Sequence, residues 1–154
     1  FRRVLFRSQN TNITNVNTKA QAAYDSGNNT LIYAQAGYAQ TELLFEMSQR
    51  WAGTNKHIML ISSMMTQSPI SSLPGLAMDQ YRIQKVALEA AVAQIRYRQL
   101  GIKLTVVRPG NIATSPDKTV PPAADVDNWA QTLVDILDLA HRKNLRIPDI
   151  SLGP

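Results

Sequence analysis

Short apolar runs alternate along this chain with longer segments of helical periodicity, and this alternation limits the folds that are open to it. The runs HIMLIS (57–62) and IKLTVVR (102–108) are bounded by turn residues and are typical of strands buried on both faces of a sheet. A third strand is expected in LRIPDISLG (145–153), where Pro148 favours a strand end or a sheet edge.

Apolar side chains recur at three- and four-residue steps in the segments that flank these runs. This spacing predicts helices over 31–51 and 79–100, and a third helix that opens at Asp125 or Asp127. Three sets of residues are expected to face the core: Ala36, Leu43, Met47 and Trp51; Ile83, Ala87, Ala90, Ala91 and Ile95; and Trp129, Leu133, Ile136, Leu137 and Ala140.

The order helix, strand, helix, strand, helix, strand predicts an α/β fold with parallel strands and right-handed crossovers, as in a Rossmann-type doubly wound sheet. A sheet of three strands, with about three long helices, is small for a doubly wound fold. We therefore expect residues 31–154 to be the C-terminal half of the domain, with the N-terminal half missing. Residues 9–30, rich in Asn, Thr, Gln and Ser, are expected to be a loop or a frayed segment.

The first eight residues, FRRVLFRS, equal the translation of the end of a common short-read sequencing adapter. We interpret them as non-native, with the natural chain starting near Gln9 and its upstream part unassembled. The alternative is a genuine basic N-terminal strand. A genomic clone that reads through these residues would refute the adapter interpretation.

Composition excludes several classes of function. Without the three arginines of the octapeptide, Lys and Arg number 13 against 11 acidic residues, and the net charge falls from +5 to +2. A nucleic-acid partner is therefore not expected.

Apolar runs are too short to cross a membrane. The chain has no Cys, which excludes disulfides, Cys-based zinc sites and thiol catalysis, and we expect a cytoplasmic protein.

The stretch DQYRIQKVALEAA (79–91) holds the residues best suited to chemistry. Helical spacing places Tyr81 and Lys85 on one face, one turn apart. An ammonium near a phenol favours the phenolate and lowers its pKa from about 10, so that the phenol can exchange a proton near neutral pH. Ser62 or Ser63, at the end of a strand, could hydrogen-bond the same substrate oxygen. The structural alternative is a half-buried tyrosine, a surface lysine and a strand-end turn.

The ordered set LISS, YRIQK and RPGNIAT, found in successive strand–helix–strand units, resembles the C-terminal half of the short-chain dehydrogenase/reductase family. The resemblance covers about residues 31–154, and 79–100 followed by LGIKLTVVRPGNIAT is its nearest part. It implies an oxidoreductase that binds NAD or NADP and transfers a hydride between the nicotinamide and a small carbonyl or alcohol substrate.

The resemblance also implies roles for particular residues. Tyr81 would be the acid/base, Lys85 would lower its pKa and hold the nicotinamide ribose, and Ser63 would polarise the substrate carbonyl. The wall beside the nicotinamide and the contact with its carboxamide or phosphate region would come from Pro109, Gly110, Ile112 and Thr114. Family members commonly dimerise through the helices that correspond to 31–51 and 79–100.

This sequence departs from the family pattern at three places. The loop from Ser63 to Tyr81 is about five residues longer than usual, which brings in Ser68 as a second candidate serine. The family's relay Asn aligns with Ala34 or Gln35. No Gly-rich phosphate loop is present, which fits a truncated chain. Two alternatives therefore stay open: a catalytically inert dinucleotide-binding relative that acts through protein contacts, and a nucleotide-sugar epimerase or dehydratase.

Overall fold

The computed structural model describes residues 3–6, 30–33, 38–68, 75–113 and 122–154. Its elements are, in chain order, β1 (Arg3–Phe6), β2 (Thr30–Tyr33), α2 (Ala39–Arg50), β3 (His57–Ile61), the 3₁₀ turn η1 (Met64–Gln67), α3 (Leu76–Tyr97), β4 (Lys103–Pro109), α4 (Val126–Arg142) and β5 (Asp149–Leu152). The strands form one parallel sheet in the order β1-β2-β3-β4-β5.

The expected α/β class with a parallel sheet is confirmed, and the three expected strands are β3, β4 and β5. Two further strands extend the sheet. The helix expected over 31–51 is wrong at its start, because Thr30–Tyr33 forms β2 and α2 begins at Ala39. Arg3–Phe6 forms β1, so a strand lies where the second interpretation of the octapeptide expects one. Residues 9–29 of the expected loop lie outside the described residues.

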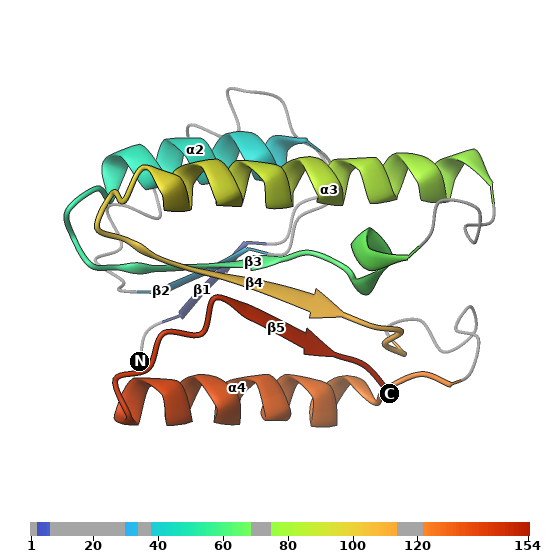
Figure 1. The fold of residues 1–154 in the computed structure, drawn as a ribbon. Helices are drawn as coiled ribbons and strands as arrows, with labels where there is room; N and C mark the ends of the chain where they lie inside the picture. Colours follow the sequence, from blue (N-terminus) through green and yellow to red (C-terminus); the bar gives the residue numbers. More distant parts are fainter. Residues whose placement is uncertain (1–2, 7–29, 34–37, 69–74, 114–121) are drawn as a thin grey trace.

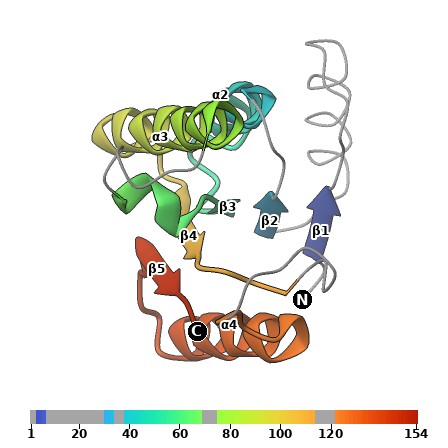
Figure 2. The same ribbon diagram turned by 90° about the vertical axis from the view of Figure 1, so that its right-hand side faces the viewer.

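The helices lie on opposite faces of the sheet. Figures 1 and 2 show α2 and α3 side by side on one face and α4 alone on the other. Successive strands always step in the same direction across the sheet. The crossover through α4 is therefore left-handed, opposite to those through α2 and α3, and the expectation of right-handed crossovers throughout is wrong.

Each face of the sheet has its own core. Ile58, Leu60 and Val106 face α2 and α3, whereas Met59 and Val107 face α4. Strands with core on both faces give the near-continuous apolar runs seen in the sequence. The helices contribute Leu43, Leu44, Met47, Trp51, Leu88, Val92 and Ile95 to the first core, and Leu133 to the second, with Trp129, Ile136 and Leu137 partly buried beside it.

The helix ends differ in part from those expected. α3 begins at Leu76 rather than Asp79 and ends at Tyr97, before the left-handed residue Gln99. Its buried face is formed by Lys85, Leu88, Ala91, Val92 and Ile95. Ile83, 54% exposed, and the exposed Ala90 were therefore wrongly assigned to the core. Asp125 caps α4, with its side chain accepting from the backbone N–H of Asn128 at 2.9 Å.

His57, at the start of β3, begins a short chain of hydrogen bonds that continues through Thr105 of β4 to the Ile147 carbonyl. Thr105 Oγ1 donates to the Ile147 carbonyl at 2.6 Å, so it accepts from His57 Nε2 at 2.8 Å, and Nε2 carries the proton of the neutral ring. Burial, helped by the charge of Lys103, lowers the pKa of His57 from 6.5 to about 4.

We expect His57 to make stability fall in mild acid. Its folded-state pKa is depressed, so the unfolded chain binds the proton first, and stability is lost as the pH falls from about 6.5 to about 4. The loss in the free energy of unfolding should be at most about 3–4 kcal/mol. Urea unfolding at several pH values would measure it. His57→Gln is the control and should have a flatter profile; equal slopes in both proteins would contradict this account.

Candidate active site

The sequence-predicted residues meet where β3 and β4 end and α3 begins. Ser63 follows β3 directly and caps the turn η1, while Tyr81 and Lys85 lie in the first half of α3. In Figure 1 this turn, drawn in green, lies beneath the N-terminal half of α3. The carboxyl ends of parallel strands are the usual place for a ligand in an open α/β sheet.

Lys85 is buried, with 4% of its surface exposed. Its Nζ donates to Gln40 Oε1 and to the Ile61 carbonyl, both at 2.8 Å. Gln40 Nε2 in turn donates to the same Ile61 carbonyl at 3.1 Å. The ammonium is therefore held by neutral oxygens from α2 and β3. Burial lowers the pKa of Lys85 to about 8, and the charge of Glu89 opposes this shift.

Gln40 is a site residue that the sequence analysis missed. Ala34 or Gln35 was aligned with the family's relay Asn, and both lie outside the described residues. Gln40, itself 1% exposed, instead brings a carboxamide to the lysine. A glutamine at a helical position ordinarily indicates a solvent-facing surface. Nothing local in the sequence links it to Lys85, which lies 45 residues away.

Tyr81 and Lys85 share a face of α3, as their spacing predicts. Lys85 Nζ lies 5.6 Å from the centre of the Tyr81 ring. The pKa of Tyr81 is nevertheless raised above its usual value, because burial disfavours the phenolate more than a hydrogen bond with the Ser63 side chain favours it. The expected lowering of the Tyr81 pKa is therefore wrong.

The two serines at the end of β3 face different partners. Ser63 Oγ accepts from the Met65 backbone N–H at 3.2 Å and hydrogen-bonds Tyr81. Ser62 Oγ donates to Glu89 Oε1 at 2.5 Å. The structure thus brings Ser63, and not Ser62, together with the tyrosine. Ser68, the other serine considered, ends η1 as its C-cap.

The chain after β4 packs tightly against the C-terminus. A Cβ on Gly110 would lie 2.9 Å from the Gly153 Cα and 3.1 Å from Met64 Sδ, so only glycine fits there without a shift. Ile112 forms a parallel bridge with Ala124. Pro109 ends β4, beside Leu152 of β5. Thr114 lies outside the described residues, so its predicted cofactor contact stays a prediction.

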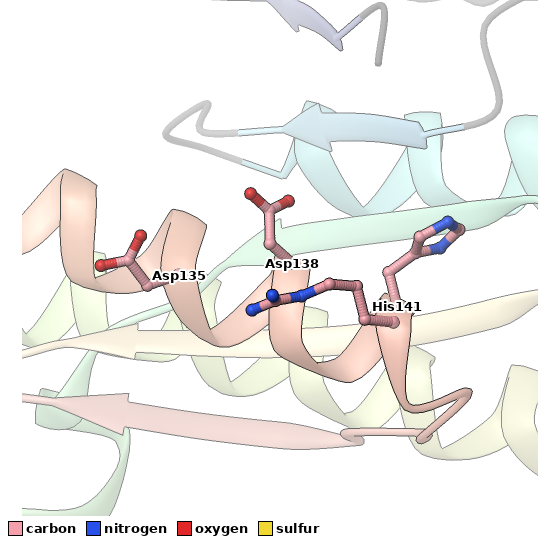
Figure 3. Close-up of a pocket in the computed structure, with 4 residues that line it drawn as sticks. Asp135, Asp138 and His141 are labelled. Carbon is pink, nitrogen blue, oxygen red and sulfur yellow. The ribbon is translucent and has the colours of Figure 1, made fainter.

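A shallow hollow of about 480 Å³ lies elsewhere, along α4, where Asp135, Asp138, His141 and Arg142 line it. Figure 3 shows the side chains of Asp135, Asp138 and His141 on this helix. α4 covers the face of the sheet opposite to α3, so the hollow is separate from Tyr81 and Lys85. Among the described residues no helix is both long and apolar enough to cross a membrane.

Comparisons with known proteins identify the fold. No protein-family model matches the chain. A search of curated proteins also gave no match. Solved structures do match. One is a short-chain dehydrogenase from Burkholderia cenocepacia J2315 in complex with NADP, 18% identical, with a TM-score of 0.66 over 93% of this chain and 66% of that one.

Two other structures have similar overlap. An alcohol dehydrogenase from Thermococcus sibiricus, complexed with 5-hydroxy-NADP, is 14% identical, with a TM-score of 0.68 over 90% of this chain and 68% of that one. A UDP-N-acetylglucosamine 4-epimerase from Bacillus cereus is 11% identical, with a TM-score of 0.57 over 97% and 68%. The chain therefore has the fold of short-chain dehydrogenases/reductases and spans about two thirds of the length of these structures.

We expect Gln40→Leu to destabilise the protein by about 1–3 kcal/mol, because the buried Lys85 ammonium would lose an acceptor and keep its desolvation cost. Urea unfolding gives the change. Gln49→Leu, an exposed position on the same helix, is the matched control and should change stability by less than about 0.5 kcal/mol. Equal effects of the two substitutions would show that Gln40 does not support the lysine.

Proposed function

We propose that the chain belongs to the short-chain dehydrogenase/reductase family and is the C-terminal part of an NAD(P)-dependent oxidoreductase acting on a small carbonyl or alcohol compound. The observation that carries the proposal is the meeting of Ser63, Tyr81 and the buried Lys85 at the carboxyl ends of β3 and β4. A cytoplasmic location and a non-native origin for residues 1–8 belong to the same proposal.

The residues present fit a nicotinamide cofactor in this half of the fold. Lys85 is a buried cation at the strand ends and would hold the ribose hydroxyls. Pro109, Gly110 and Ile112 would form the wall beside the ring, with Thr114 at its carboxamide or phosphates. The cofactor, when bound, supplies or accepts the hydride.

In the reducing direction the protein's own residues supply the proton. Ser63 donates a hydrogen bond to the substrate oxygen, and Tyr81 transfers its phenolic proton to that oxygen as the C–H bond forms at the carbonyl carbon. The product is an alcohol, and Tyr81 is left as a phenolate beside the Lys85 ammonium. Since burial raises the pKa of Tyr81, the phenol starts protonated, as a general acid must.

A second candidate function is epimerisation or dehydration of a nucleotide sugar. The match to the Bacillus cereus epimerase over 97% of this chain favours it. The same tyrosine would then act on a sugar hydroxyl, with the transferred hydride returned to the substrate. Conversion of the substrate without net consumption of NADH or NADPH would distinguish this function from that of a reductase.

We expect Tyr81→Phe to lower kcat by about 10²–10⁴-fold and to leave cofactor binding unchanged, because only the proton donor is lost. Lys85→Met should weaken cofactor binding as well. The test uses a clone that includes the coding sequence upstream of Gln9, with NADH and NADPH titrated by fluorescence and carbonyl compounds screened for turnover. If the parent protein and Tyr81→Phe bind the cofactor equally and neither turns over a substrate, the inert dinucleotide-binding relative is favoured. No binding of either cofactor would contradict the family assignment.

We also propose that two copies pair through the outer faces of α2 and α3. Three apolar side chains there are 40–54% exposed: Phe45, Ile83 and Val86. Sedimentation equilibrium should give twice the monomer mass, and Phe45→Asp with Ile83→Asp should return it to the monomer mass. A monomeric parent protein would contradict the pairing.

A further inference from the structure

The carboxylate of Glu89 is the meeting point of a polar cluster next to the proposed site. Glu89 follows Lys85 by one helical turn on α3, on the side that faces the end of β3. Its Oε1 accepts from Ser62 Oγ at 2.5 Å, from Thr66 Oγ1 at 3.0 Å and from Arg108 Nε at 3.0 Å, and its Oε2 accepts from Arg108 Nη2 at 2.8 Å. One side chain thus joins α3 to the residue that follows β3, to η1 and to β4.

Two of these contacts bracket Ser63. Ser62 directly precedes it, and Thr66 lies three residues after it. Thr66 Oγ1 is also 2.8 Å from the Ser63 carbonyl oxygen, so its single proton is shared between that carbonyl and Glu89. The Thr66 backbone N–H donates to the same carbonyl at 3.1 Å. The backbone on both sides of Ser63 is therefore fixed relative to the helix that carries Tyr81 and Lys85.

Arg108 keeps the Glu89 carboxylate charged. Burial alone would raise the pKa of Glu89, but hydrogen bonds from Arg108, Ser62 and Thr66 outweigh it and lower the pKa. The guanidinium binds both carboxylate oxygens and also pairs with Asp149 Oδ1 at 3.0 Å. Arg108 and Glu89 are 14% and 20% exposed, whereas Asp149 is 39% exposed, so the cluster runs from the site to the surface.

We propose that Glu89 is a positioning residue for Ser63: it holds the Ser62–Thr66 turn against α3, so that the Ser63 hydroxyl is fixed beside Tyr81. Glu89 itself contacts no reacting atom in this account. The proposal rests on the proposed function for the role of Ser63, but the position of the turn relative to α3 can be tested without turnover.

The first arm of the test measures the turn itself. In the protein cloned with its upstream sequence, Glu89→Gln should speed hydrogen–deuterium exchange of the Met65 and Thr66 amides by about tenfold relative to the parent protein. Asp149→Asn is the matched control: it makes the same carboxylate-to-amide change in the same Arg108 cluster without contact to the turn, and it should leave these amides unchanged. Equal exchange in both variants overturns the proposal.

The second arm measures whether Glu89 acts through Ser63. Glu89→Gln should lower kcat by about ten- to a hundredfold, with the Kd for NADPH unchanged, because a misplaced hydroxyl affects the proton step and not cofactor binding. In a Ser63→Ala background the same change should have no further effect within about twofold. Losses that multiply in the double variant would assign Glu89 a general structural role and overturn the proposal.

Ser62→Ala serves where Glu89→Gln does not fold, because it removes one donor and leaves the Arg108 pair intact. Ser62→Ala should also speed exchange of the Met65 and Thr66 amides and lower kcat, each by a smaller factor than Glu89→Gln does. A loss of kcat that adds to that of Ser63→Ala in the double variant would again overturn the proposal. If the parent protein turns over no substrate, the proposed function fails. The exchange arm then still decides whether Glu89 holds the turn.

Discussion

The ammonium of Lys85 is buried between α2, β3 and α3, and the protein has to replace the water that it loses. It does so with the Gln40 carboxamide and the Ile61 carbonyl, each 2.8 Å from Nζ. These two acceptors are neutral, and the charge of Glu89 offsets the burial only in part, so the pKa of the lysine falls to about 8. Because its acceptors come from α2 and from the end of β3, the Lys85 ammonium can be held only where these two elements meet α3. The packing of α2 against α3 therefore affects the geometry of the site.

One face of α3 carries side chains of the first core as well as those of the proposed site. Tyr81, Lys85 and Glu89 follow one another at one-turn intervals in the part of α3 that lies near the carboxyl ends of β3 and β4, and Leu88, Val92 and Ile95 continue the buried face into the first core. Apolar packing of the second half of the helix therefore sets the direction of the polar side chains in the first half. The carboxylate of Glu89 then joins this helix to the turn that carries Ser63.

Local patterns in the sequence were enough to predict much of the fold. Apolar runs located β3 and β4 because both strands have core on each face. The short strand β2 was merged into a helix, since four residues carry too little periodicity to be separated. In the site, spacing predicted that Tyr81 and Lys85 share a face. Gln40 and Glu89 could not be predicted, because their partners lie 45 and 27 residues away and depend on how helices and strands meet.

The most direct test of the account is a crystal structure of the protein, extended upstream of Gln9, with NADPH. The account predicts the nicotinamide at the carboxyl ends of β3 and β4, with its ribose against Lys85 and its ring between Tyr81 and the Pro109–Gly110 wall, and with Gln40 still bonded to the lysine. A nicotinamide bound away from Tyr81 and Lys85, or a site left empty at saturating NADPH, would contradict it.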